Sequence, residues 1–150
     1  MERVLGIDPG EARFGVAISD ELGLLAHPLE TIFLAKCNPL DRIVELSGQH
    51  HVAHIVVGVA RNMDGSNGAA AEKALAFIHE LRQRVGCPVT AWDERWSTVQ
   101  ARRQMREAGR KEIRQKEVID QAAAQIILQS WLDARPPLFP EADGGPLHIP

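Results

Sequence analysis

The sequence predicts an α/β fold, in which a mixed five-stranded sheet carries helices on both faces. Residues 3–34 read as three short strands joined by tight turns, which predicts an antiparallel meander. Residues 38–92 then alternate between helical and strand patterns, the order that produces parallel strands covered by helices. The first strand is an almost continuous apolar run, so we expect it at the centre of the sheet, buried on both faces.

Length and composition fit one domain. At 150 residues, 45% of them hydrophobic, the chain is long enough for a single core. We expect residues 1–135 to form that domain and the Pro/Gly-rich residues 136–150 to form a flexible tail. No apolar run is long enough to cross a membrane and no leader opens the chain, so we expect a cytoplasmic protein. Cys37 and Cys87 are expected to remain reduced, because neither lies in a metal-binding pattern.

The expected meander begins with Arg3–Asp8, a short buried strand that ends in a Pro9-Gly10 turn. In Arg13–Ser19 large apolar residues alternate with smaller ones, which is typical of a hairpin partner. After a second turn, a third strand lies somewhere within Leu24–Leu34. These three segments account for the first half of the sheet.

The middle of the chain carries clear boundary signals. Asn38 followed by Pro39 predicts a helix start, and Gly48 predicts its end. His54–Val59 reads as a buried strand, and a polar loop then leads to a helix at about Ala69–Val85. The last strand is therefore expected to follow this helix directly.

That last strand, Val89–Trp92, delivers Asp93, Glu94 and Arg95 at its carboxyl end. The capping box Ser97-Thr98-Val99-Gln100 then predicts a helix that runs to Gly109. Open α/β sheets place their binding sites at the carboxyl ends of strands, so Glu94 is a candidate functional residue. The open alternative is an ion pair between Glu94 and Arg95.

The final helix, expected at about Lys116–Ala134, carries one carboxylate on an unexpected face. Polar residues recur every fourth position and predict a solvated stripe, formed by Glu117, Gln121, Gln125, Gln129 and Asp133. Asp120 lies off this stripe, together with Ala124 and Ile127, on a face expected to be buried. A buried carboxylate is costly unless it is paired or binds a metal. Lys116, one turn earlier, is the alternative partner.

Asp8 presents the same problem in the first strand. Aspartate is depleted in strands, so its presence in a central one suggests a purpose beyond packing. The alternative is that Asp8 caps the following turn. If Asp8, Glu94 and Asp120 converge, their oxygens suit hard cations such as Mg²⁺ or Mn²⁺, and two such ions can activate water against a phosphodiester.

Charge is distributed unevenly along the chain. Residues 95–116 carry eight basic residues and two acidic ones, a net +6, although the whole chain has a formal charge of −3. Arg102, Arg103 and Arg106 share the outer face of the expected helix at 97–109. Such a segment is typical of a surface that binds nucleic-acid phosphates. A solvated helix face with no ligand is equally compatible with charge alone.

The chain closely resembles the bacterial YqgF (RuvX) family of the RNase H-like superfamily. Matching motifs occur in the family's order over nearly the whole chain. They are Gly6-Ile7-Asp8-Pro9-Gly10, Arg13-Phe14-Gly15-Val16-Ala17-Ile18-Ser19-Asp20, Val56-Val57-Gly58, Asn62-Met63-Asp64-Gly65, Asp93-Glu94-Arg95-Trp96-Ser97-Thr98 and Lys116 with residues 120–129. One departure is Ala60, which stands where the family typically has proline.

The resemblance implies an RNase H-like fold and a catalytic, metal-binding triad of Asp8, Glu94 and Asp120. It implies a metal-dependent nuclease that cuts the 5′ end of precursor 16S ribosomal RNA. The substrate-binding residues expected from the matches and the basic segment are Arg13, Arg95, Arg102, Arg103, Arg106 and Lys116. Resolution of branched DNA (Holliday junctions) and a non-catalytic nucleic-acid-binding module remain alternatives. The expected protein is a monomer or a homodimer.

Overall fold

The computed structural model describes residues 2–96 and 113–134, with the backbone alone described for residues 113–120. The elements within these residues are β1 (Arg3–Pro9), β2 (Arg13–Ser19), β3 (Ala26–Phe33), α1 (Pro39–Gln49), β4 (Val52–Val59), α2 (Ala69–Arg82), β5 (Val89–Asp93), the short 3₁₀ helix η1 (Glu94–Trp96) and α4 (Ile113–Ala134). The helix expected from Ser97 to Gly109 and the tail at 136–150 lie outside the described residues.

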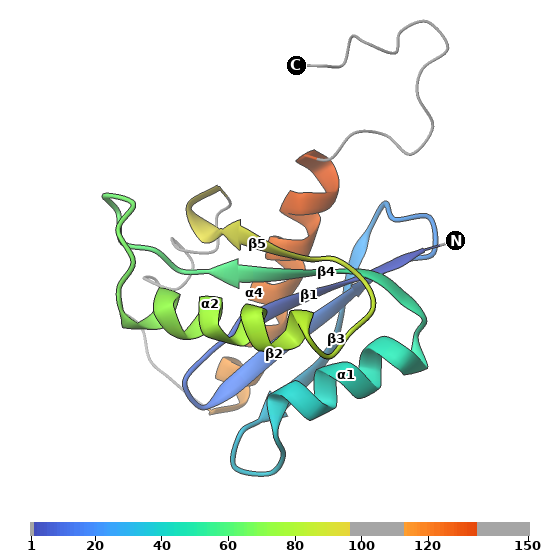
Figure 1. Cartoon of the computed structure of the whole chain (residues 1–150), viewed down its shortest axis with the longest axis horizontal. Coiled ribbons are helices and arrows are strands. Elements are labelled where there is room, and N and C mark those ends of the chain that lie inside the picture. Colours follow the sequence, from blue (N-terminus) through green and yellow to red (C-terminus); the bar gives the residue numbers. More distant parts are fainter. Residues whose placement is uncertain (1, 97–112, 135–150) are drawn as a thin grey trace, which may run out of the picture.

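The five strands form one mixed sheet in the order β3-β2-β1-β4-β5, which confirms the expected central position of β1 (Figure 1). β1 pairs antiparallel with β2 because a tight turn joins them, and β2 pairs in the same way with β3. β1 also pairs in parallel with β4, and β4 with β5. Each parallel connection passes through a helix, α1 or α2, as such crossovers require.

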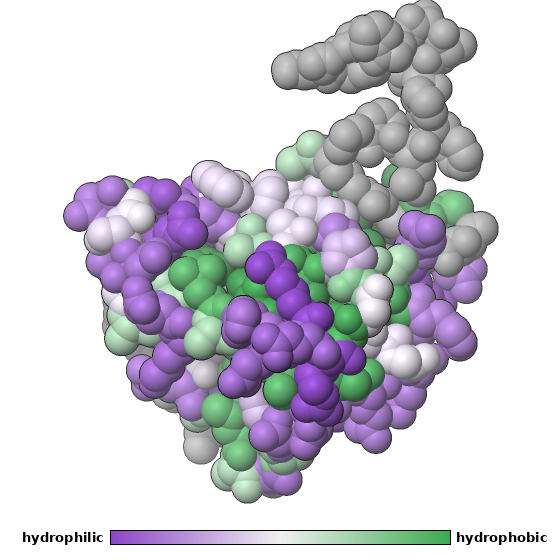
Figure 2. Space-filling model, viewed as in Figure 1, coloured by the Kyte–Doolittle hydropathy of each residue, from purple (hydrophilic) through white to green (hydrophobic). Residues whose placement is uncertain are grey.

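Helices cover both faces of the sheet, and strand alternation decides which side chains each face receives (Figure 1). On one face, α1 and α2 pack against Leu5, Ile7 and their neighbours in a cluster of buried side chains. On the other face, α4 packs against Val4, Val56 and Ala17. Figure 2 shows hydrophobic surface between the hydrophilic side chains on the side of α1 and α2.

Local signals predicted the element boundaries to within a few residues. The side chain of Asn38 accepts hydrogen bonds from the backbone N–H groups of Leu40 (2.9 Å) and Asp41 (3.1 Å), so it caps α1 as expected. α2 ends at Arg82, three residues before the expected end. Within residues 2–96 and 113–134, no helix is sufficiently long and apolar to span a bilayer.

The glutamines of α4 do not form a solvated stripe, and this expectation was wrong. The side-chain amide of Gln125 donates to the carbonyl of Ala26 (2.9 Å), and Gln129 accepts from the N–H of Ala26 (2.8 Å). Gln129 also donates to the carbonyl of Leu24 (2.9 Å), and Gln121 donates to the hydroxyl of Thr31 (2.9 Å). β3 is an edge strand, and backbone groups near such an edge need partners that no further strand supplies. The glutamines therefore tie α4 to β3.

α4 lies unusually close to β1 because a glycine faces it. A Cβ atom on Gly6 would stand 2.5 Å from the Cβ of Leu128 and 3.1 Å from the carbonyl oxygen of Ala124. The nearest atom is the Cβ of Leu128, which is fixed to the helix backbone and cannot move aside by a change of rotamer. Gly6 therefore sets the distance between the central strand and α4.

We expect Gly6→Ala to lower the free energy of unfolding by about 1–3 kcal/mol, because overpacking forces the helix away from the sheet. Gly48→Ala is the matched control: a Cβ there meets nothing within 4 Å, and alanine favours a helix. The control should leave stability unchanged or raise it by up to about 1 kcal/mol. Urea denaturation of both variants measures the difference, and equal unfolding midpoints for Gly6→Ala and the wild type would contradict the close contact.

Candidate active site

Asp8 lies near the carboxyl end of the central strand and is almost fully buried, with 2% of its surface exposed. Strand alternation places residue 8 on the same face as Val4 and Gly6, the face that α4 covers. The register that pairs Ile7 with Val57 puts Asp8 beside Gly58 of β4. A strand aspartate is therefore held where the sheet meets α4.

Glu94 is the first residue of η1, directly after β5, and 1% of its surface is exposed. Its Oε2 atom lies 3.0 Å from the position that a Cβ on Gly58 would take. β4 separates β5 from β1, so Glu94 does not leave a strand adjacent to Asp8. The carboxylate instead lies over β4, in space that Gly58 leaves open. Asp8 and Glu94 thus flank the same glycine.

The third expected carboxylate, Asp120, belongs to α4, but its side chain lies outside the described ones. Among the side chains that the structure describes, no group of three His, Cys, Asp or Glu residues is placed to hold a metal. The described part of the site therefore contains two buried carboxylates, Asp8 and Glu94, on either side of Gly58.

The expected substrate-binding residues fall into two groups. Arg102, Arg103 and Arg106 lie outside the described residues, and Lys116 lies in the part of α4 with backbone alone. Arg13 begins β2, is partly buried, and lines a hollow beside Asp8. The basic segment thus contributes no described side chain except that of Arg95.

Arg95 binds Asp93, a residue that the sequence analysis did not single out. Its Nη2 atom donates to Oδ2 of Asp93 at 2.6 Å, Nε lies 3.1 Å from both carboxylate oxygens, and the backbone N–H donates to Oδ1 at 2.9 Å. Asp93 is 3% exposed. The Arg95 guanidinium lowers the pKa of the Asp93 carboxyl below its ordinary value of 3.8. The two residues on either side of Glu94 therefore hold each other.

Arg95 also reaches the loop between β4 and α2. Its Nη1 atom donates to the carbonyl of Met63 (3.3 Å), and the guanidinium lies against Gly65, whose φ of 90° favours glycine. Within this loop the hydroxyl of Ser66 donates to Asp64 (2.6 Å) and accepts from the amide of Asn62 (2.9 Å). Through its contacts with Asp93 and Met63, Arg95 connects the turn that carries Glu94 to this loop.

Two of these residues had signals in the sequence. Gly58 interrupts an otherwise β-branched buried strand, and an isolated strand glycine often marks a close approach by another group. Asp93 stands two residues before an arginine at a strand end. Neither signal identifies the partner, because both depend on how η1 turns after β5.

We expect Arg95→Gln to lower the free energy of unfolding at pH 7 by about 1–3 kcal/mol, because the buried carboxylate of Asp93 loses its nearest cation and keeps the more distant Arg61 at 3.7 Å. The lowered pKa of Asp93 means that the pair stabilises the fold above the ordinary value of 3.8 and loses this effect as pH falls through the lowered one. The deficit of the variant should therefore shrink over that range, as measured by urea unfolding.

Arg84→Gln is the charge-matched control, because Arg84 forms an exposed ion pair with Asp41 (3.0 Å) and should contribute no more than about 1 kcal/mol. A deficit for Arg95→Gln that is independent of pH, or no larger than that of the control, would show that the pair does not behave as described.

Comparisons with known proteins agree with this architecture. The family described as "RuvX: Holliday junction resolvase" matches residues 2–134. A relative from Myxococcus xanthus is 46% identical over 137 residues, covering 90% of this chain and 91% of its own. One from Acetivibrio thermocellus is 48% identical over 136 residues, covering 89% and 96%. Both bear the name "Putative pre-16S rRNA nuclease".

Solved structures show the same fold. Thermus thermophilus RuvC is similar with a TM-score of 0.53 and 20% identity, over 89% of this chain and 95% of that one. RuvC from T. thermophilus in complex with a Holliday junction substrate gives a TM-score of 0.51 and 19% identity, over 90% and 96%. The RNase H-like fold expected from the resemblance is thereby confirmed. With its match over residues 2–134 and relatives nearly half identical, the chain belongs to the YqgF (RuvX) family.

Proposed function

We propose that this protein is a cytoplasmic, metal-dependent nuclease that hydrolyses phosphodiester bonds at the 5′ end of precursor 16S ribosomal RNA. The observation that carries the proposal is the pair of buried carboxylates, Asp8 and Glu94, on either side of Gly58. The names of the relatives support the substrate. The family match and the RuvC-like fold support a nuclease.

Asp120 is proposed as the third carboxylate, because the position of α4 along the sheet puts residue 120 near the level of Asp8. Gln121 bonds to Thr31, Thr31 pairs with Gly15, and Gly15 pairs with Asp8. Residue 121 is thus level with Asp8 across the sheet. Residue 120 precedes it, and helical periodicity gives it the same face as Ala124, which is fully buried.

The residues present suit a hard divalent cation. Two carboxylates buried at the same edge of the sheet, at the ends of β1 and β5, repel each other, and a cation between their oxygens offsets that repulsion. Asp8, Glu94 and Asp120 would hold Mg²⁺ or Mn²⁺, with two ions as the proposed number. Bound there, the ions would supply an activated water and stabilise the leaving oxygen. The protein itself holds the three carboxylates in place: Asp8 on the central strand β1, Glu94 on η1, which the contacts of Arg95 hold, and Asp120 on α4.

Cations around this edge are proposed to hold the substrate's phosphates. Arg13 lines the same hollow as Asp8, and Arg102, Arg103, Arg106 and Lys116 are proposed to extend the contact along the RNA. Arg95 is now assigned a different role, because its guanidinium is already engaged by Asp93 and by the loop at Met63. We propose that Arg95 is a positioning residue that orients Glu94.

Resolution of Holliday junctions is the second candidate, and the description of the matching family as a Holliday junction resolvase supports it. A resolvase makes paired symmetric cuts, which requires a homodimer with two sites. A nuclease that trims one RNA end works as a monomer or as a dimer. The two candidates therefore differ in substrate and in the need for a partner subunit.

Incubation of the protein with Mn²⁺ or Mg²⁺, a labelled precursor rRNA fragment and a labelled four-way junction tests the proposal. We expect cleavage of the RNA, abolished by a chelator. Asp8→Asn and Glu94→Gln should each lower its rate by roughly 100–1,000-fold with RNA binding retained, because only the stabilisation of developing charge is lost. Asp41→Asn, an exposed carboxylate on α1, is the matched control and should cleave normally.

Faster cutting of the junction than of the RNA would favour the second candidate. Binding of either substrate without metal-dependent cutting would contradict both, and would identify a non-catalytic nucleic-acid-binding module.

A further inference from the structure

A hollow of about 670 Å³ lies at the carboxyl edge of the sheet, between the β1–β2 turn and α2. Asp8 and Arg13 contribute to its lining, so the hollow lies next to Asp8, one of the proposed catalytic carboxylates. This edge is also a switch point of the sheet, because the strand order runs from β1 to β3 on one side and resumes with β4 on the other. Ligands of open α/β sheets bind at such points.

The hollow is apolar within and charged at its rim. Pro9, Phe14, Leu34 and Phe77 supply the apolar lining. The rings of Phe14 and Phe77 lie edge to face with their centroids 5.1 Å apart, so core packing fixes the position of Phe77.

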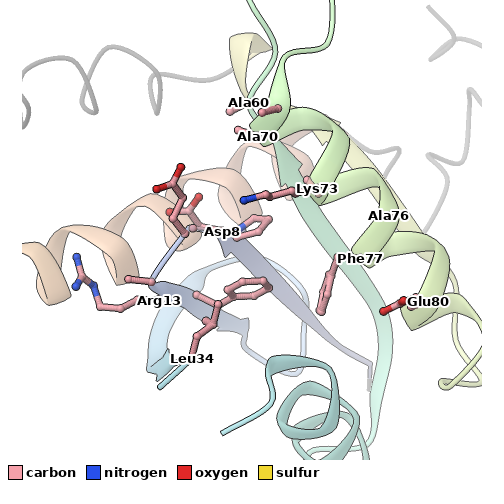
Figure 3. A pocket seen from close by; sticks show the side chains of 16 residues that line it. Asp8, Arg13, Leu34, Ala60, Ala70, Lys73, Ala76, Phe77 and Glu80 are labelled. Atoms are coloured by element: carbon pink, nitrogen blue, oxygen red, sulfur yellow. The ribbon is translucent and has the colours of Figure 1, made fainter. Parts of the chain in front are cut away.

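The rim carries a cation close to the catalytic edge. Figure 3 shows Lys73 reaching from α2 towards the end of β1 that carries Asp8, with Phe77 one turn further along the helix. Within the described part of the chain Lys73 has no ion-pair partner. Glu11 and Glu80 also line the hollow. The carboxylates of Glu11 and Glu80 repel a phosphate. A phosphate is therefore expected to lie near the ammonium of Lys73.

We propose that this hollow binds one unpaired nucleotide of the substrate strand, next to the phosphodiester that is cut. Its base packs among Phe77, Leu34 and Pro9, and its phosphate lies against the ammonium of Lys73. This inference rests on the proposed nuclease function and adds a requirement to it. The strand must be single-stranded on one side of the cut, since a base cannot enter the hollow while it is stacked and paired in a duplex.

Three observations favour a nucleotide over other occupants. The volume lies within the range of small-ligand sites, roughly 300–1,000 Å³. A half-buried aromatic ring next to a lysine is the combination that binds single strands without reading their sequence. The hollow is also continuous with Asp8, so a strand held by the carboxylates has a direct path into it.

Binding of a labelled single-stranded RNA, and of the same RNA annealed to its complement, tests this inference. The measurements use fluorescence anisotropy in Ca²⁺, so that affinity is read without turnover. Ala76→Glu places a bulky anion at the exposed lining of the hollow, and Phe77→Leu removes the aromatic ring while keeping apolar bulk. We expect each to weaken single-strand binding roughly tenfold, with a smaller change for the duplex.

Lys73→Ala should weaken single-strand binding and reduce the slope of log K against log salt concentration by about 0.7, the value for one released counterion. Arg84→Ala, two residues beyond the opposite end of α2, removes the same charge and should change neither quantity. The slope of log K against log salt concentration distinguishes a lost phosphate contact from damaged folding. Loss of one phosphate contact lowers the number of released counterions by one, whereas damaged folding does not produce that specific change.

If the three hollow variants bind single-stranded RNA as tightly as Arg84→Ala does, the inference is overturned. In that case metal-dependent cleavage by the wild type would still support the nuclease function. A wild-type protein that cuts RNA but prefers the duplex would also overturn the inference alone. A wild type that binds neither RNA would overturn both.

Discussion

The glycines that face α4 are the constraint on which the rest of the structure depends. At Gly6 the helix lies so close to the central strand that even a methyl group would collide with Leu128. At Gly58 the same lack of a side chain makes room for Ile127 and for the carboxylate of Glu94. The two glycines therefore let the helix pack closely and let Glu94, the first residue after β5, lie over β4 towards Asp8. The core and the site share the same geometry.

Polar interactions hold the two segments on either side of this contact: α4 against β3, and η1 against the loop after β4. Glutamines of α4 hold the helix to the edge strand β3, which sets its level along the sheet. On the opposite edge, the bonds from Arg95 to Asp93 and Met63 hold η1 and the loop after β4 together. Ala60, the departure from the family's motifs noted above, belongs to this loop.

The sequence predicted those features that depend on neighbouring residues. The turn at Pro9-Gly10 and the cap at Asn38 were found because their signals are local, and strand order followed from chain order. The glutamine stripe was misjudged because periodicity shows that residues share a face and cannot show what lies opposite. The sequence analysis considered Glu94 as the ion-pair partner of Arg95, whereas Arg95 bonds to Asp93, because the turn after β5 sets which carboxylate it reaches. Residue type and expected position suggested that Asp8, Glu94 and Asp120 converge, and the resemblance to a family then implied that they form a catalytic triad.

The central claim is that Asp8 and Glu94 face a common cation site over Gly58. Anomalous diffraction from crystals soaked in Mn²⁺ tests it most directly, because the scattering identifies the metal independently of any activity. A shared cation site predicts a manganese peak within roughly 2.0–2.6 Å of carboxylate oxygens from both residues, the range of metal–oxygen bonds. Manganese bound elsewhere, with both carboxylates free of metal, would contradict it.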